Sequence, residues 1–189
     1  ADGSAVFVGG PSSDGTEAFP RTAGGGLQGL GDLPGGSFYS LAVAVSADGA
    51  TVVGSSRCDQ GFQAFTWTAG SDIDGLGELD GGAYGSYGNG ISANGDVIVG
   101  SSASASGWEV FRRESDGPLT PLGDLAGGGF QGSAAAVSAD GGTIVGTGLS
   151  ALGYEALRWT SATGMTPLGD LPGGIFQSSA AGVNADGSV

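Results

Sequence analysis

Short runs of β-branched and other apolar residues alternate along this chain with clusters of glycine, serine and aspartate. The runs Thr51–Gly54, Val97–Gly100 and Thr143–Gly146 each lie between two such clusters, at matching places. Segments of this kind predict short strands that are joined by tight turns. No stretch carries apolar residues at helical spacing, so the pattern predicts an all-β chain.

The whole pattern repeats every 46 residues. The phrase Ala-Asp-Gly, or once Ala-Asn-Gly, begins at Ala1, Ala47, Ala93, Ala139 and Ala185. We therefore expect one domain, 1–189, built from repeats at 1–46, 47–92, 93–138 and 139–184, with 185–189 as an overhang or the start of a further repeat. A period without drift predicts that the copies occupy equivalent places in a closed or regular object.

Each repeat is expected to contribute four strands. In the second repeat they are predicted at Thr51–Gly54, at Gln63–Thr68, around Leu76–Leu79 and at Tyr87–Ser92. The Asp-Gly or Asn-Gly step between the fourth strand and the next predicts a two-residue hairpin turn, because these residues tolerate a positive φ. Four antiparallel strands in a repeat of this length are typical of a propeller blade, so we predict a four-bladed, β-propeller-like fold.

Closure of the ring depends on the two ends of the repeat pattern. The first repeat lacks its own first strand, and Ser178–Asn184 has the sequence to complete that blade, which predicts a ring closed within one chain. Three possibilities stay open for the residues that follow. They are a frayed end, the stub of a further repeat, or a strand that is offered to a neighbouring chain and permits self-association.

Bulky residues recur at fixed places in the repeat and are expected to form the core between blades. The sets expected there are Phe19, Phe65, Phe111 and Leu157, and Phe38, Tyr84, Phe130 and Phe176. Further expected core positions are the recurring leucines Leu30, Leu76, Leu122 and Leu168, and Leu33, Leu79, Leu125 and Leu171.

Charge narrows the range of partners. The chain has no lysine or histidine and only five arginines against nineteen acidic residues, for a net charge of −14. Nucleic acid is excluded as a partner by this balance, because binding to phosphates needs clustered basic residues. The chain also lacks an apolar run of membrane-spanning length, so no membrane insertion is expected.

Catalysis has few candidate residues. Without histidine or lysine, and with Cys58 as the single cysteine, the usual general bases and nucleophiles are missing. We therefore expect that the protein is not an enzyme. A hydrolase that uses paired carboxylates is the remaining catalytic alternative.

An aromatic residue follows a glycine at one place in three repeats, giving Phe62, Trp108 and Tyr154, with Thr16 at the same place in the first repeat. Each aromatic is followed by Gln63, Glu109 or Glu155. An aromatic face beside polar acceptors suits a sugar ring, so these are candidate ligand-binding residues. The alternative is that the aromatics pack between blades, as aromatic residues in short strands usually do.

A carboxylate also recurs once in each repeat, at Asp32, Glu78, Asp124 and Asp170. Around a fourfold axis these would form a ring of oxygen ligands suited to Ca²⁺, which makes calcium a candidate cofactor. The alternative is that each carboxylate accepts hydrogen bonds from backbone amides of the neighbouring glycine-rich turn. The same alternative applies to the aspartates of the Ala-Asp-Gly phrases.

Several phrases occur in constant order: Ala-Val-Ser-Ala-Asp-Gly and Val-Val-Gly-Ser-Ser within Ala44–Ser56, Ala-Phe-Thr-Trp-Thr at Ala64–Thr68, and Leu-Gly-Asp-Leu-Pro-Gly-Gly at Leu168–Gly174. Together they resemble the HAF family of extracellular bacterial repeats. The chain departs from the pattern where Arg21 and Arg113 stand in place of the tryptophans of other repeats. The resemblance implies a secreted or surface-exposed bacterial repeat protein without established enzymatic activity, and brings no catalytic residues.

The expected function is that of a non-enzymatic, extracellular or cell-surface module that is structural or adhesive. Its partners would be other proteins or glycans at the cell surface. The alternative is a carbohydrate-binding, lectin-like propeller that uses Phe62, Trp108 and Tyr154.

Overall fold

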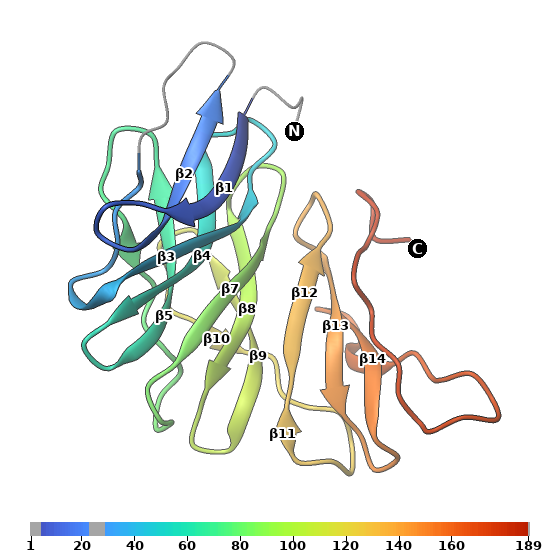
Figure 1. Ribbon diagram of the computed structural model, residues 1–189. Coiled ribbons are helices and arrows are strands. Elements are labelled where there is room, and N and C mark those ends of the chain that lie inside the picture. Colours follow the sequence, from blue (N-terminus) through green and yellow to red (C-terminus); the bar gives the residue numbers. More distant parts are fainter. Residues whose placement is uncertain (1–4, 23–28, 189) are drawn as a thin grey trace.

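A computed structural model describes residues 5–22 and 29–188, and these form fifteen β-strands (Figure 1). The secondary structure of this described part is entirely strands and turns, as the apolar pattern predicts. It includes no helix of the length and apolar character needed to cross a membrane.

The strands form a hairpin followed by three four-stranded antiparallel blades. The hairpin consists of β1 (Ala5–Pro11) and β2 (Thr16–Thr22). The next blade contains β3 (Gly35–Val45), β4 (Thr51–Cys58), β5 (Gly61–Thr68) and β6 (Asp74–Gly75). It is followed by a blade of β7 (Ser86–Ile91), β8 (Val97–Ala103), β9 (Gly107–Glu114) and β10 (Thr120–Pro121). The last blade contains β12 (Ser133–Val137), β13 (Thr143–Leu149), β14 (Tyr154–Thr160) and β15 (Gly164–Pro167).

Successive blades are joined by short parallel bridges at equivalent places. In the described part of the chain this pairing is formed at three places, between the start of a third strand and the segment that leads onward from its blade or hairpin. The pairs are Thr16 with Tyr39, the short strand β11 (Phe130–Gln131) with Gly107 and Trp108 of β9, and Tyr154 with Gln177. These bridges fix the register of one blade against the next.

The hydrophobic core consists of separate clusters, each lying between two blades. Leu33 packs with Val52 and Phe65 at the first junction, and Leu79 packs with Ile98 and Phe111 at the second. At the third junction, Leu125 packs in a cluster with Ile144 and Leu157 (the full cluster is Val97, Val99, Val110, Leu125, Ala134, Ile144 and Leu157). The expectation of packing between blades is confirmed for Phe65, Phe111 and Leu157 and for Leu33, Leu79 and Leu125, whereas Leu171 is 85% exposed. Phe38, Tyr84, Phe130 and Phe176 are only partly buried.

A glycine in the second strand of each blade allows the first strand to approach closely. A Cβ atom on Gly100 would lie 1.9 Å from the carbonyl oxygen of Tyr87, and Gly54 and Gly146 are equally crowded. The register of the first strand shifts beside each glycine, which is the mark of a β-bulge. The repeated glycine is therefore a requirement of the bulge.

The third predicted strand lies earlier than expected. In the second repeat it is β6, and Leu76–Leu79 lies outside the strands. The chain leaves the sheet there because Leu79 turns into the next junction, where its backbone N–H donates to Ser102 Oγ at 2.9 Å. Burial of the leucine thus decides where the strand ends.

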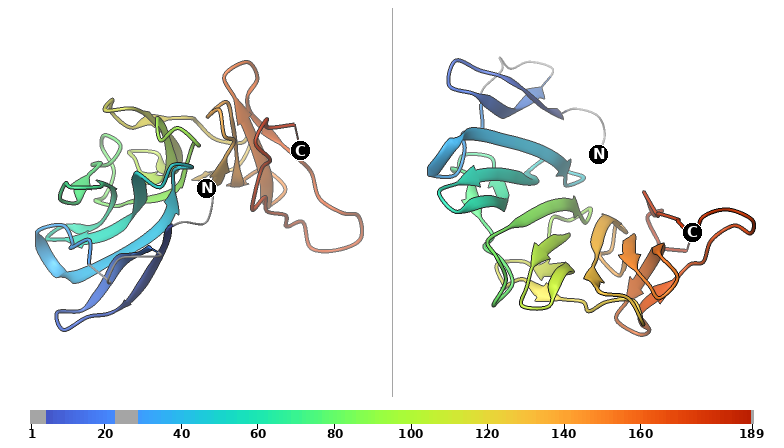
Figure 2. Two further views of the ribbon diagram at one scale, coloured as in Figure 1. Left: turned by 90° about the horizontal axis from the view of Figure 1, so that it is seen from above. Right: turned by 60° about the horizontal axis from the view of Figure 1, so that its bottom comes forward.

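The blades follow an arc that is open on one side (Figure 2). The segment Ser178–Asn184 does not pair with β1 in the described part of the chain, so the predicted closure is not formed. Instead it lies along the last blade, where Ser178 N donates to Tyr154 O and Ala180 N donates to Gly146 O at 3.0 and 3.2 Å. The angle between blades depends on the side chains that fill each junction, and at the observed angle these repeats do not complete a circle.

Candidate functional site

The aromatic residues singled out in the sequence lie at the junctions between blades, at or near the start of each third strand. Phe62 lies with its ring centroid 5.6 Å from Tyr39, edge to face, and 5.6 Å from Tyr87. Tyr87 in turn lies 5.7 Å from Trp108. We call Tyr39, Phe62, Tyr87 and Trp108 the aromatic row. The guanidinium of Arg57 lies 5.0 Å from the Phe62 centroid, where it can make a cation–π contact.

The aromatic row leads to a cavity between Trp108 and Tyr154. The two side chains are 39% and 43% exposed, which is high for large aromatic residues at a blade junction. The cavity has a volume of about 320 Å³ and is also lined by Ser101, Gln131, Gly132, Ser133 and Thr147. The Tyr154 hydroxyl donates to Gln131 Oε1, which fixes the orientation of the tyrosine. Aromatic walls with polar groups at the edge are typical of a small-ligand site.

The polar partners predicted for these aromatics do not line this cavity. Glu109 and Glu155 are 7% and 5% exposed. Glu109 accepts from Ser104 Oγ, and Glu155 accepts from Gly169 N at 2.9 Å. Neighbouring residues in a strand point to opposite faces of the sheet, so each acid faces away from the aromatic before it. The polar residues that line the cavity are instead Gln131, Ser133 and Thr147, with Ser101.

The recurring carboxylates do not form a ring. In the part of the chain that the structure describes, no three acidic, cysteine or histidine side chains come together as metal ligands would. The Asp170 carboxylate accepts from Leu171 N and Gln177 N at 2.8 and 2.7 Å, which is the alternative role given to it above. The carboxylates of Asp32, Glu78, Asp124 and Asp170 are therefore spread along the chain, one in each repeat.

Two of these carboxyl groups are held in an unfavourable environment for a negative charge. Burial raises the pKa of Asp124, and the negative charge of Glu109 raises it further. Burial likewise raises the pKa of Asp32, with a smaller contribution from Glu17. One carboxylate oxygen of Asp124, Oδ1, is buried without a hydrogen-bond partner. A buried oxygen in this condition destabilises the ionised form of the group.

The Ala-Asp-Gly phrases form the turns between the first and second strands of the blades. The turn is longer than the predicted two residues, since Ser46 N donates to Thr51 O across it, and only Gly49 within it has a positive φ. Asp48 accepts from Ser46 Oγ at 2.6 Å and from Ala50 N, and the serine hydroxyl is the main cause that lowers the pKa of Asp48. Turn chemistry accounts for this aspartate.

The same phrases also link one blade to the next. Ala47 N donates to Ala93 O at 2.8 Å, Ala93 N donates to Ala139 O, and Ala139 N donates to Ala185 O, both at 3.0 Å. This line of backbone hydrogen bonds gives a physical reason for the constant 46-residue spacing. An insertion between two turns would have to loop out without moving either alanine.

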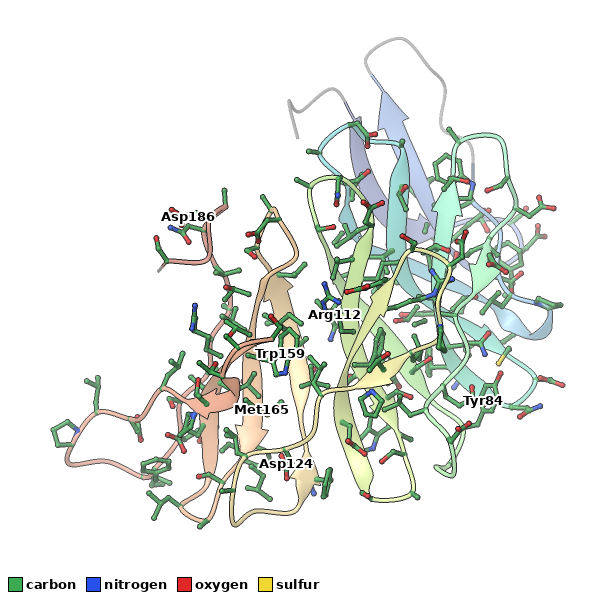
Figure 3. The ribbon with its side chains drawn as sticks, turned by 180° about the vertical axis from the view of Figure 1, so that it is seen from behind. Tyr84, Arg112, Asp124, Trp159, Met165 and Asp186 are labelled. Carbon is green, nitrogen blue, oxygen red and sulfur yellow. The ribbon has the colours of Figure 1, made fainter. Side chains whose placement is uncertain are left out.

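A second contact spans the junction between β9 and β14. The Arg112 guanidinium lies 6.0 Å from the Trp159 ring centroid, forms an ion pair with Glu114, and donates to Gly141 O at 3.5 Å. Figure 3 shows Arg112 and Trp159 side by side, well away from Tyr84. These contacts engage the arginine within the protein.

Sequence reasoning did not identify Tyr39 and Tyr87 as members of the site. Tyr87 lies in β7, on the strand that enters the next blade, so its place beside Phe62 depends on how two blades meet. The sequence does contain one signal for Tyr87. Its place in the repeat is held by residues of different size: Leu41, Tyr87, Ser133 and Ser179.

Comparison with known proteins supports the fold alone. No family model matches the chain, and no curated protein matches it. Two similar solved structures are a putative TolB from Agrobacterium tumefaciens (TM-score 0.67, 19% identity, 90% of this chain and 62% of that one) and TolB from Acinetobacter baumannii (TM-score 0.64, 13% identity, 88% and 41%). This chain thus spans about three fifths and two fifths of those proteins. Together with the observed blades, these similarities identify the fold as all-β and β-propeller-like.

Proposed function

We propose that the protein is a non-enzymatic module of the bacterial cell surface or extracellular space, with a structural or adhesive role. Its resemblance to HAF repeats supports this location, and its lack of histidine and lysine supports a role without catalysis. Its partners would be proteins or glycans of the cell surface. A module of this kind needs a stable scaffold and an exposed binding face.

The observation that carries this proposal is the aromatic row with its neighbouring cavity. Aromatic side chains supply large contact areas at a low entropic cost, and they are enriched at binding surfaces. Here Trp108 remains 39% exposed and Tyr154 43% exposed, although both lie at a blade junction. Packing of the blades alone does not require that exposure.

Adhesion can be measured with beads that carry the chain, under flow over surfaces coated with mucin glycoprotein or with albumin. We expect retention on one of these surfaces that falls on the change Trp108→Ala. The matched control is Trp159→Ala, which removes a tryptophan at the other end of the same junction. Equal retention of wild type and Trp108→Ala on every surface would contradict the proposed role of the aromatic row. Release of product from polysaccharides incubated with the chain would contradict the non-enzymatic assignment.

Carbohydrate binding is the second candidate function, and the composition of the cavity favours it. Trp108 and Tyr154 form apolar walls, while Gln131, Ser133 and Thr147 place amide and hydroxyl groups beside them. A sugar ring has an apolar face and polar edges that match these two kinds of group. Binding on a glycan array that disappears with Trp108→Ala would support this function, and an array without any signal would remove it.

A further inference from the structure

One position in the repeat decides whether the space between two aromatic side chains is filled. Tyr87 occupies this position at the junction of β5 and β9, and its ring lies between those of Phe62 and Trp108. At the next junction the same position is Ser133, which pairs with Thr147 just as Tyr87 pairs with Ser101. The flanking aromatics are then Trp108 and Tyr154, and the cavity of about 320 Å³ lies there.

We propose that this gap binds a single pyranose ring of a neutral glycan, held between Trp108 and Tyr154. The proposal rests on the carbohydrate-binding function and specifies its site. The cavity is present because a serine replaces a tyrosine in an otherwise repeated arrangement of aromatic rings.

The protein itself shows what fits such a space. The six-membered ring of Tyr87 lies 5.6 and 5.7 Å from the rings on either side of it, within the range of favourable ring contacts. A pyranose ring also has six members and can stack on an aromatic face. The cavity volume lies near the lower end for ligand pockets, so it suits one ring better than several.

Most of the surface that lines the gap is apolar, and a few polar groups lie at its edge. Ser133 and Thr147 each bring a hydroxyl, and Gln131 brings an amide. These groups can exchange hydrogen bonds with sugar hydroxyls in several orientations. Gln131 Oε1 already accepts from the Tyr154 hydroxyl, and Ser133 Oγ accepts from Asn89 Nδ2 at 3.3 Å. The Gln131 amide N–H and the Thr147 hydroxyl are therefore the groups of the gap that a sugar would engage.

Charge selects a neutral sugar over an acidic one. The chain carries a net charge of −14 and has no lysine. An anionic sugar such as a uronic acid would be repelled by this field, most strongly at low salt.

The same position of the repeat recurs at Ser179. Ser179 lines a cavity of about 570 Å³ together with Tyr154, Gln177, Ser178 and Thr147. Tyr154 is the single aromatic side chain among these residues. We therefore expect one binding site in this chain rather than two.

The test exchanges the residues of the two junctions. Ser133→Tyr fills the gap in the way that Tyr87 fills its counterpart, and Tyr87→Ser opens a second gap between Phe62 and Trp108. Each residue already occurs at the other junction, so both changes suit the fold, and circular dichroism checks that they do. Binding of cellohexaose, mannohexaose and xylohexaose is measured by titration calorimetry, with a hexamer of galacturonic acid as the anionic comparison.

We expect the wild type to bind at least one of the neutral hexamers at one site per chain. Ser133→Tyr should weaken that binding by at least about tenfold, and Tyr87→Ser should raise the number of sites from one toward two. Unchanged affinity in Ser133→Tyr would overturn the gap as the site, and tighter binding of the galacturonic acid hexamer than of any neutral one would overturn the choice of a neutral sugar. Either result would leave carbohydrate binding in place. No binding of any hexamer by the wild type would overturn the carbohydrate-binding function itself, and this site with it.

Discussion

At the residue scale, one buried serine organises each turn between the first two strands of a blade. Ser138 Oγ donates to Asp140 Oδ1 at 2.6 Å and accepts from Thr143 N at 2.9 Å, and the side chain is only 1% exposed. The same contacts recur around Ser46 and Ser92. The turn therefore depends on the hydroxyl more than on the charge of the acid.

We expect Ser138→Ala to lower the free energy of unfolding by about 1–3 kcal/mol, because it leaves the buried Thr143 N–H without its side-chain acceptor. Urea denaturation measures the change. The matched variant is Asp140→Asn, which reproduces the contacts that Asn94 makes in another repeat and should be nearly neutral at pH 7. A neutral Ser138→Ala would show that the turn does not need the hydroxyl.

Asp140→Asn should also alter the response to acid. The Ser138 hydroxyl, followed by the Gly142 amide, lowers the pKa of Asp140 below its usual value of 3.8. The stabilisation from this group is therefore present above that value and is lost as the pH falls through the lowered pKa. The wild type should lose more stability between pH 5 and pH 2 than Asp140→Asn does, as measured by melting temperature across this range. Parallel curves for the two proteins would contradict the assignment.

Asp124 shows the opposite dependence on pH. Burial raises its pKa, so the folded state holds the proton more tightly than the unfolded chain. The stability cost of its ionisation is absent below the ordinary carboxyl pKa and grows as the pH rises through the raised value. Asp124→Asn should thus raise the melting temperature at pH 7, by on the order of one or two degrees.

The gain from Asp124→Asn should shrink at pH 3, where the wild-type carboxyl is already protonated. Asp80→Asn at an exposed position controls for the general loss of a negative charge. A gain of the same size at both pH values would mean that ionisation of Asp124 is not the cause.

At the scale of elements, the bulge in the first strand of each blade requires a glycine opposite it. We expect Gly100→Ala to lower the free energy of unfolding by about 1–3 kcal/mol, because its Cβ would overlap the carbonyl oxygen of Tyr87. Gly129→Ala is the control, since no atom lies within 4 Å of an added Cβ there. Chemical denaturation compares the two, and equal stabilities would show that the strands can separate without cost.

The strands themselves were predictable to different degrees. The β-branched runs such as Thr51–Gly54 fall inside observed strands, because alternation and turn residues are local signals. The third strand was misplaced onto Leu76–Leu79, since the burial of Leu79 depends on a neighbouring blade. Glu109 and Glu155 do not line the cavity for a similar reason, because the face to which a side chain points depends on the register of the strand.

At the scale of the whole molecule, equivalent leucines lie in opposite environments. Leu125 is 3% exposed and packs between blades, whereas Leu171 at the same place in the repeat is 85% exposed. We expect Leu125→Ala to cost about 2–5 kcal/mol of unfolding free energy. Leu171→Ala should change it by less than about 0.5 kcal/mol.

Denaturation at several protein concentrations, with the native mass from light scattering, tests this contrast. A loss of unfolding free energy in Leu171→Ala that increased with protein concentration would mean that Leu171 is buried between two chains. That result would contradict the expectation. A costly Leu171→Ala at every concentration would mean that the leucine is covered within a single chain.

The periodic chain, its all-β character and its turns could be inferred from residues close together in sequence, because strand alternation and turn preferences act over a few positions. The candidate aromatics Phe62, Trp108 and Tyr154 were also visible as a repeated position. Three features depend on how two blades meet. They are the open arc, the contacts of Tyr39 and Tyr87 with those aromatics, and the gap beside Ser133. Those contacts link residues 21 or more positions apart, and the volume of the side chains at each junction decides them.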